Sequence, residues 1–174
     1  MFFRKAASRY ACFTARRFWL CAAFTALLLV FGVQGGHSSG SPCGAMVVRI
    51  YDWKNGTLHA EAPVAANSRL FFGWIHSLEK IPWNEYYKID ASYRLVLDAI
   101  SFPAFGAGIP ADRGTVCYVK DGLIHMEGIA QVFPELVWLN SHTATRDIVL
   151  DGQLLVSGAQ LPQHTRMRLL IEKR

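Results

Sequence analysis

The sequence has no Asp, Glu, Lys or Arg between Phe18 and Val48, and charged residues make up only 18% of the whole chain. It also contains no Cys-x-x-Cys and no His-x-x-x-His, which argues against the common metal and redox motifs. Apolar residues reach 52%, so the chain can bury a core and long disorder is excluded. At 174 residues there is room for one domain and a targeting segment.

The net charge of +5 comes from the N-terminus. Five of the 18 basic residues precede residue 18, where there is no acidic residue, and the remaining 13 are balanced by all 13 acidic residues. A nucleic-acid groove needs positive charge clustered on the folded domain itself. We therefore expect no nucleic-acid partner.

The apolar run 18–33 follows this basic tail and is typical of an export signal or membrane anchor. As a helix its 16 residues would span about 24 Å, whereas a bilayer core is about 30 Å thick. The length of the run is therefore intermediate between that of a cleavable signal and that of a single membrane span. Small residues at 33–35 would allow cleavage. The basic residues predict a cytoplasmic N-terminus, with 37–174 on the periplasmic side of the cell inner membrane.

We divide the chain into a signal or anchor segment (1–36), a Gly- and Ser-rich tether (37–45) and a β-rich extracytoplasmic domain (46–174). The domain shows no sustained helical period, and three turns (Asn55-Gly56, Asp121-Gly122 and Asp151-Gly152) predict hairpins. In 70–76 both faces are largely apolar, which indicates a central strand. The predicted strands are 46–53, 70–76, 83–89, 93–102, 116–120, 123–127, 146–150, 153–156 and 166–171.

This pattern predicts a mainly β fold, either an antiparallel β-sandwich or a partly closed barrel, preceded by one hydrophobic helix. Cys43 and Cys117 would both lie in an oxidising compartment, so they are candidates for a disulfide.

The densest polar group lies between two predicted strands and includes His76, Ser77, Glu79, Lys80 and Glu85. Across an antiparallel pair, His76 and Glu85 could face each other, which would suit proton transfer, ligand binding or a pH-sensitive contact. A polar hairpin end with a surface ion pair is the simpler alternative.

Neither hydrolysis nor metal binding is favoured at this group. Ser77 and His76 are neighbours and would point to opposite faces of a strand, so they suit a nucleophile and its base poorly. His76, His125 and His142 have no recognised ligand spacing. We expect no catalytic residue, no metal and no cofactor.

A second feature is the segment 102–110, in which Gly106 and Gly108 flank an alanine before Pro110. Its exposed amides could hold a carboxylate or phosphate, or could allow another chain to approach closely. It lacks the Gly-Lys-Ser/Thr of a nucleotide-binding loop.

The two segments together, Trp74-Ile-His-Ser-Leu-Glu-Lys-Ile-Pro-Trp-Asn-Glu-Tyr86 and Phe105-Gly-Ala-Gly-Ile-Pro110, resemble the domain of unknown function 1850 family. The resemblance extends from about residue 46 to the C-terminus, with a departure at Trp83 and Asn84. It implies a small exported or membrane-anchored protein associated with TAXI-type TRAP transporters, which use a solute receptor and a permease. The family has no established catalytic residues, so none is transferred.

Three functions follow as hypotheses. The first is a non-catalytic, membrane-tethered accessory protein of a TRAP transporter, contacting the permease or the solute receptor. The second is a stand-alone periplasmic β domain that binds a small ligand or metal through His76, Glu79 and Glu85. The third, which we disfavour, is an enzyme.

Overall fold

The computed structural model describes residues 44–174, and the predicted signal or anchor, most of the tether and Cys43 lie outside this part. Strands are the main secondary structure of the described residues, as predicted. They are β1 (Met46–Asp52), β2 (Leu58–Pro63), β3 (Arg69–Ile75), β4 (Pro82–Ile89), β5 (Leu95–Phe102), β6 (Val116–Lys120), β7 (Leu123–Phe133), β8 (Leu136–Leu139), β9 (Thr145–Leu150), β10 (Gln153–Ser157) and β11 (Arg166–Lys173), with one 3₁₀ turn, η1 (Gly158–Gln160).

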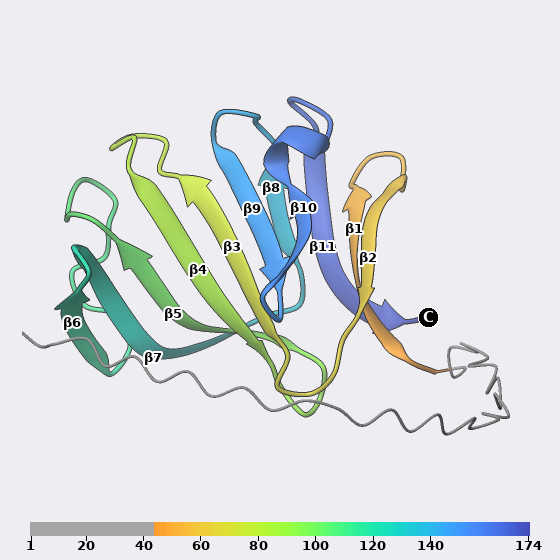
Figure 1. Ribbon diagram of the computed structural model, residues 1–174, viewed down its shortest axis with the longest axis horizontal. Coiled ribbons are helices and arrows are strands. Elements are labelled where there is room, and N and C mark those ends of the chain that lie inside the picture. Colours follow the sequence, from red (N-terminus) through yellow and green to blue (C-terminus); the bar gives the residue numbers. More distant parts are fainter. Residues whose placement is uncertain (1–43) are drawn as a thin grey trace, which may run out of the picture. The chain divides into compact units, whose positions relative to one another are not determined.

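The strands form two antiparallel sheets (Figure 1). One sheet has the order β10-β9-β3-β4-β5-β7-β6, and the other has the order β2-β1-β11-β8. No hydrogen-bonded ladder joins the two sheets within residues 44–174, so the β-sandwich describes the fold and the barrel alternative does not. Within the same residues, no helix has the length and apolar character needed to cross a bilayer.

The three predicted hairpins are present because their turns supply the backbone conformation that tight connections need. Asp121 and Gly122, between β6 and β7, have φ of 52° and 76°. Asp151 and Gly152, between β9 and β10, have φ of 48° and 80°. Positive φ at both central positions matches the twist of antiparallel strands, and Asp-Gly adopts it readily. Gly56, with φ of 72°, serves the turn between β1 and β2.

One hydrophobic core joins the two sheets. Ile50 and Leu169 contribute from the four-stranded sheet, and Leu70, Phe102 and Ile148 from the seven-stranded sheet; all are almost fully buried. β3 is an interior strand, as its two apolar faces predicted. Leu70 and Phe72 point into the core. On the opposite face Phe71 is half-buried and packs against Tyr86.

β8 is the strand that most affects the site described below. The chain leaves the seven-stranded sheet at Phe133, the end of β7, and enters the four-stranded sheet at Leu136. There β8 pairs with β11 and forms the edge of its sheet. A wall of side chains from β8 therefore faces the inner side of the larger sheet.

Candidate functional site

The loop between β3 and β4 is a tight turn organised around His76. The His76 amide donates to the Ile81 carbonyl (2.8 Å), and the Lys80 amide donates to the His76 carbonyl (2.9 Å). The Glu79 amide donates to Nδ1 of the His76 ring (3.3 Å), so the neutral ring carries its proton on Nε2. The predicted polar group is therefore a closed turn with His76 at its base.

Aromatic rings hold the His76 ring in place. Its centroid lies 5.7 Å from that of Trp74 and 5.8 Å from that of Trp83. Trp83 in turn stacks on Phe102, with centroids 5.1 Å apart and planes 8° apart. His76 is thus the outermost member of an aromatic row that continues into the core.

The Gly-rich loop binds a carboxylate, and that carboxylate is Glu79. The Ala107 amide donates to Oε1 of Glu79 at 2.7 Å. The side chain lies so close to Gly106 that a Cβ there would be 2.5 Å from Cδ of Glu79. Nε2 of His76 would lie 3.9 Å from a Cβ at Gly108, whose φ is +79°. We call the two contacting loops, 76–81 and 103–110, the loop corner.

The loop corner presents two large apolar side chains to solvent. Leu78 is 64% exposed and Phe105 is 55% exposed, and each is next in sequence to a residue of the Glu79–Gly106 contact. Ser77 and Lys80 are also exposed, whereas Pro110 is half-buried. No hydrogen bond joins Ser77 to His76 in the described part of the chain, so the geometry does not favour a nucleophile and base.

Glu85 does not face His76, and that hypothesis was wrong. The antiparallel register places Phe72 opposite Glu85, while the His76 amide pairs with Ile81. The connection between β3 and β4 is short, spanning residues 76–81, and the His76–Ile81 pair closes it, so Glu85 lies four residues beyond the partner of His76. Glu85 therefore belongs to a different site.

Glu85 lies on the inner face of β4, between Trp83 and Tyr87. The indole N–H of Trp83 donates to its Oε1 (3.1 Å), and the Tyr87 hydroxyl donates to its Oε2 (2.7 Å). Burial, followed by the neighbouring negative charge of Glu85, raises the pKa of Tyr87 far above its ordinary value. The phenol consequently keeps its proton and remains a donor.

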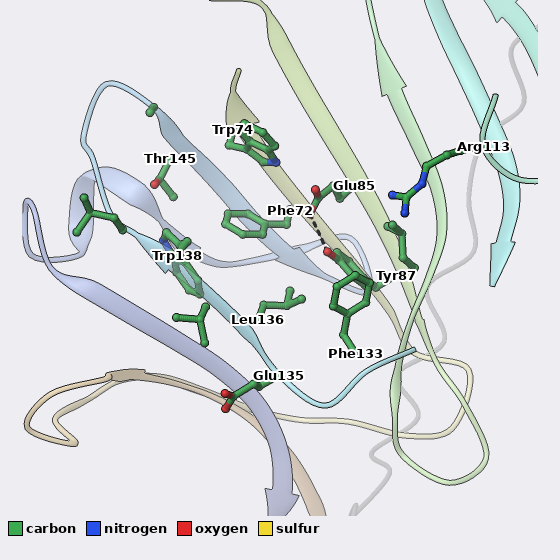
Figure 2. A pocket seen from close by; sticks show the side chains of 14 residues that line it. Phe72, Trp74, Glu85, Tyr87, Arg113, Phe133, Glu135, Leu136, Trp138 and Thr145 are labelled. Atoms are coloured by element: carbon green, nitrogen blue, oxygen red, sulfur yellow. Dashed lines mark hydrogen bonds between the residues drawn. The ribbon is translucent and has the colours of Figure 1, made fainter. Parts of the chain in front are cut away.

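A cavity of about 600 Å³ opens in front of Glu85, between the inner face of the seven-stranded sheet and β8. Figure 2 shows Glu85 beside Phe72 and Tyr87, with Trp138 and Leu136 among the side chains drawn from β8. We call this cavity the inter-sheet pocket. Its exposed lining residues, which mark its mouth, are Arg113, Val137 and Leu139.

The remaining candidate residues lie apart. His125 stacks on Tyr118 of the β6–β7 hairpin, with centroids 5.1 Å apart. His142 bonds through Nε2 to the Leu161 carbonyl (2.8 Å). Between residues 44 and 174 no three metal-ligating side chains cluster. Cys117 is exposed on β6, and its predicted partner Cys43 lies outside the described residues, so this disulfide stays a prediction.

Sequence reasoning missed the inter-sheet pocket. A signal was present, since the alternating residues Trp83, Glu85, Tyr87 and Ile89 place one carboxylate on an otherwise apolar face. The opposite wall could not be foreseen, because β8 was not predicted.

The two segments that carried the family resemblance meet in the loop corner. Residues 71–155 match the family model described as domain of unknown function (DUF1850), a shorter stretch than the resemblance from residue 46 onward suggested. No curated protein and no solved structure matches the chain. The segment that forms β3 to β9, the loop corner and the walls of the inter-sheet pocket is therefore similar to the DUF1850 domain family.

Proposed function

We propose that this chain is a membrane-tethered, non-catalytic accessory protein of a TAXI-type TRAP transporter. Its β domain would lie on the extracytoplasmic side and contact the permease or the solute receptor through the loop corner. One observation carries the proposal. The two loops of the family motif are hydrogen-bonded to each other, and each exposes one large apolar side chain, Leu78 or Phe105, next in sequence to the contact between the loops.

The chemistry of the loop corner suits contact with a protein. Leu78 and Phe105 can be removed from water by a partner, as apolar anchors at protein interfaces commonly are. The Glu79–Ala107 hydrogen bond already orders both loops, so binding would cost less conformational entropy than binding by mobile loops.

Affinity purification tests this contact. Full-length tagged protein should recover a TRAP permease or receptor, and the double variant Leu78→Asp, Phe105→Asp should lose it. Leu154→Asp is a matched control, because Leu154 is similarly exposed (58%) but lies on the edge strand β10. Equal recovery by all three proteins, or a protein that is always recovered alone, would contradict the proposal.

The membrane tether has a separate test. The basic N-terminus and the apolar run 18–33 motivate it. The full-length protein should sediment with inner membranes, and its domain should be accessible to protease from the periplasmic side only. Intact protein that fractionates with the cytosol would remove both the tether and the transporter link.

The non-catalytic character can be tested at Ser77, whose exposed hydroxyl would be the nucleophile if the protein were a hydrolase. Ser77→Ala should transport solute at the wild-type rate. A large loss of activity in this variant, with the transporter complex still assembled, would favour an enzyme.

Small-ligand binding remains the alternative, in an altered form. The His76 ring accepts from the Glu79 amide of its own loop, and the Glu79 carboxylate accepts from the Ala107 amide, whereas Glu85 lines the inter-sheet pocket. The three residues therefore do not form one ligand set. A small ligand would instead bind in the inter-sheet pocket, beside Glu85.

A further inference from the structure

We propose that the inter-sheet pocket binds a small organic cation, an ammonium group that carries an aromatic or other apolar substituent. This inference goes beyond the accessory role proposed above and does not depend on it. The following observations on Glu85, the pocket walls and the mouth of the pocket support it.

The first observation is the charge of Glu85. Its two oxygens accept hydrogen bonds from neutral donors, Trp83 and Tyr87, and no cation of the described chain forms an ion pair with it. A half-buried carboxylate is costly when no opposite charge accompanies it. It also has capacity for about four hydrogen bonds, of which two are used. An ammonium group would supply both the missing charge and the missing donors.

The second observation is the aromatic character of the walls. Phe72 of the larger sheet meets Trp138 of β8 edge-on, with centroids 5.1 Å apart. Tyr87 meets Phe133 in the same way, at 5.9 Å. Together with Trp74 these rings line the space around Glu85 (Figure 2). The faces of Trp, Tyr and Phe attract cations, most strongly where water is excluded.

The other two charged residues that line the pocket, Glu135 and Arg113, already have polar partners. Glu135 forms an ion pair with Arg168, so its charge is compensated. Arg113 is exposed at the mouth and donates to Gln131 at 2.8 Å. Water screens an exposed charge much more than a half-buried one. Glu85 therefore dominates the electrostatics inside the pocket.

The size of the pocket fits a small molecule. A volume of about 600 Å³ lies within the range of about 300–1,000 Å³ that is usual for ligand sites. Predominantly apolar and aromatic walls with one oriented polar group are the usual composition of such sites.

Three probes that share a 2-phenylethyl group test the proposal on the full-length protein. 2-Phenylethylamine is cationic at neutral pH, 2-phenylethanol is neutral and 3-phenylpropionate is anionic. Titration followed by tryptophan fluorescence or calorimetry should show binding of the amine. The alcohol and the carboxylate should bind at least about tenfold more weakly, since a charge-assisted bond is lost.

Glu85→Gln should weaken amine binding about tenfold or more and leave the weak binding of the alcohol unchanged. Glu127→Gln is a matched control, because Glu127 also accepts from a tyrosine hydroxyl (Tyr118, 2.5 Å) but does not line this pocket. Ala144→Phe, a change in the pocket lining that keeps Glu85, should abolish binding and serves if the first variant does not fold.

Several outcomes would overturn the proposal. These are no amine binding at millimolar concentration, equal amine affinity in wild type and Glu85→Gln, or tighter binding of the carboxylate than of the amine. Tighter carboxylate binding would instead indicate an anion site at Arg113.

Discussion

Trp83 donates its indole N–H to the carboxylate of Glu85 at 3.1 Å, while the same ring system packs against His76. Trp83, which is only 7% exposed, therefore connects His76 of the loop corner with Glu85 of the inter-sheet pocket. A change at Trp83 should consequently affect both sites.

The first prediction concerns this shared side chain. Trp83→Phe keeps an aromatic ring but removes the N–H and part of the buried volume. We expect a loss of about 1–3 kcal/mol in the free energy of unfolding, from the cavity and the unmade hydrogen bond. Urea unfolding measures it. Trp53→Phe, at a half-exposed site over Arg166, should cost much less; equal losses would contradict the role assigned to Trp83.

The second prediction concerns the closure of the loop corner. Gly106→Ala places a methyl group where the Glu79 side chain lies, and the flexible carboxylate should move away. The Ala107 amide would lose its acceptor and exchange with solvent faster, with a stability change below about 1 kcal/mol because the contact is exposed. Hydrogen exchange of that amide measures the effect. Glu79→Ala should reproduce it, and unchanged protection in both variants would show that the contact is absent.

The third prediction concerns Asn140, which is fully buried at the end of β8. Its Nδ2 group donates to the carbonyls of Gly158, Leu161 and Pro162 at 3.0, 3.2 and 3.0 Å, fixing the segment that leads into β11. Asn140→Ala removes this donor from the Gly158 and Pro162 carbonyls, whereas the Leu161 carbonyl keeps its bond to the His142 ring. We expect a loss of about 2–3 kcal/mol.

Chemical denaturation measures this loss. Asn55→Ala, which removes a turn hydrogen bond at an exposed site, should cost about 1 kcal/mol or less. A loss at Asn140 no larger than that at Asn55 would show that the Gly158 and Pro162 carbonyls find other donors.

The fourth prediction concerns acid stability. The Tyr51 hydroxyl (2.6 Å) and then the Arg49 guanidinium (2.9 Å) hold the pKa of Glu172 below its ordinary value of 4.5. Because the folded pKa is the lower one, the stabilisation is present above pH 4.5 and is lost as the pH falls through the folded pKa. Glu172→Gln should therefore flatten the fall in melting temperature between neutral pH and the acid range.

Melting curves of wild type and variant across this range measure the difference. Asp112→Asn, at an exposed loop position, should leave the acid dependence as in wild type. Parallel curves for wild type and Glu172→Gln would mean that Tyr51 and Arg49 do not favour the ionised carboxylate.

The hairpins could be predicted because their signals are local. Asp121-Gly122 and Asp151-Gly152 specify both the turn and the pairing of the flanking strands. β2 and β8 were missed for the opposite reason. β2 contains alanine, glutamate and proline, which favour strands weakly, and β8 has four residues that follow Pro134. These strands form through pairing with distant segments, which local composition does not reveal.

The extent of β7 illustrates the same limit. The prediction ended this strand at 127, yet it continues to Phe133. Gly128 and Ala130 have φ of 70° and 55°, which breaks the regular alternation, and β5 pairs on both sides of the irregularity. Tertiary pairing thus maintains a strand that its own sequence interrupts.

The candidate site divides in a similar way. The two motif segments could be recognised in the sequence as separate features, and the Glu79–Ala107 contact shows that they meet. The distance between Glu85 and His76 depends on the register of β3 and β4, which the length of the connecting turn sets. That length could not be predicted from the sequence.

The pairing of β1 with β11 has a consequence for biosynthesis. Met46 lies opposite Lys173 and Asp52 opposite Met167, so the first described strand is hydrogen-bonded along its whole length to the last. The four-stranded sheet can therefore assemble only after β11 has been synthesised, and contacts so distant along the chain form slowly. Removal of Arg166–Lys173 would leave β1 and β8 without their common neighbour.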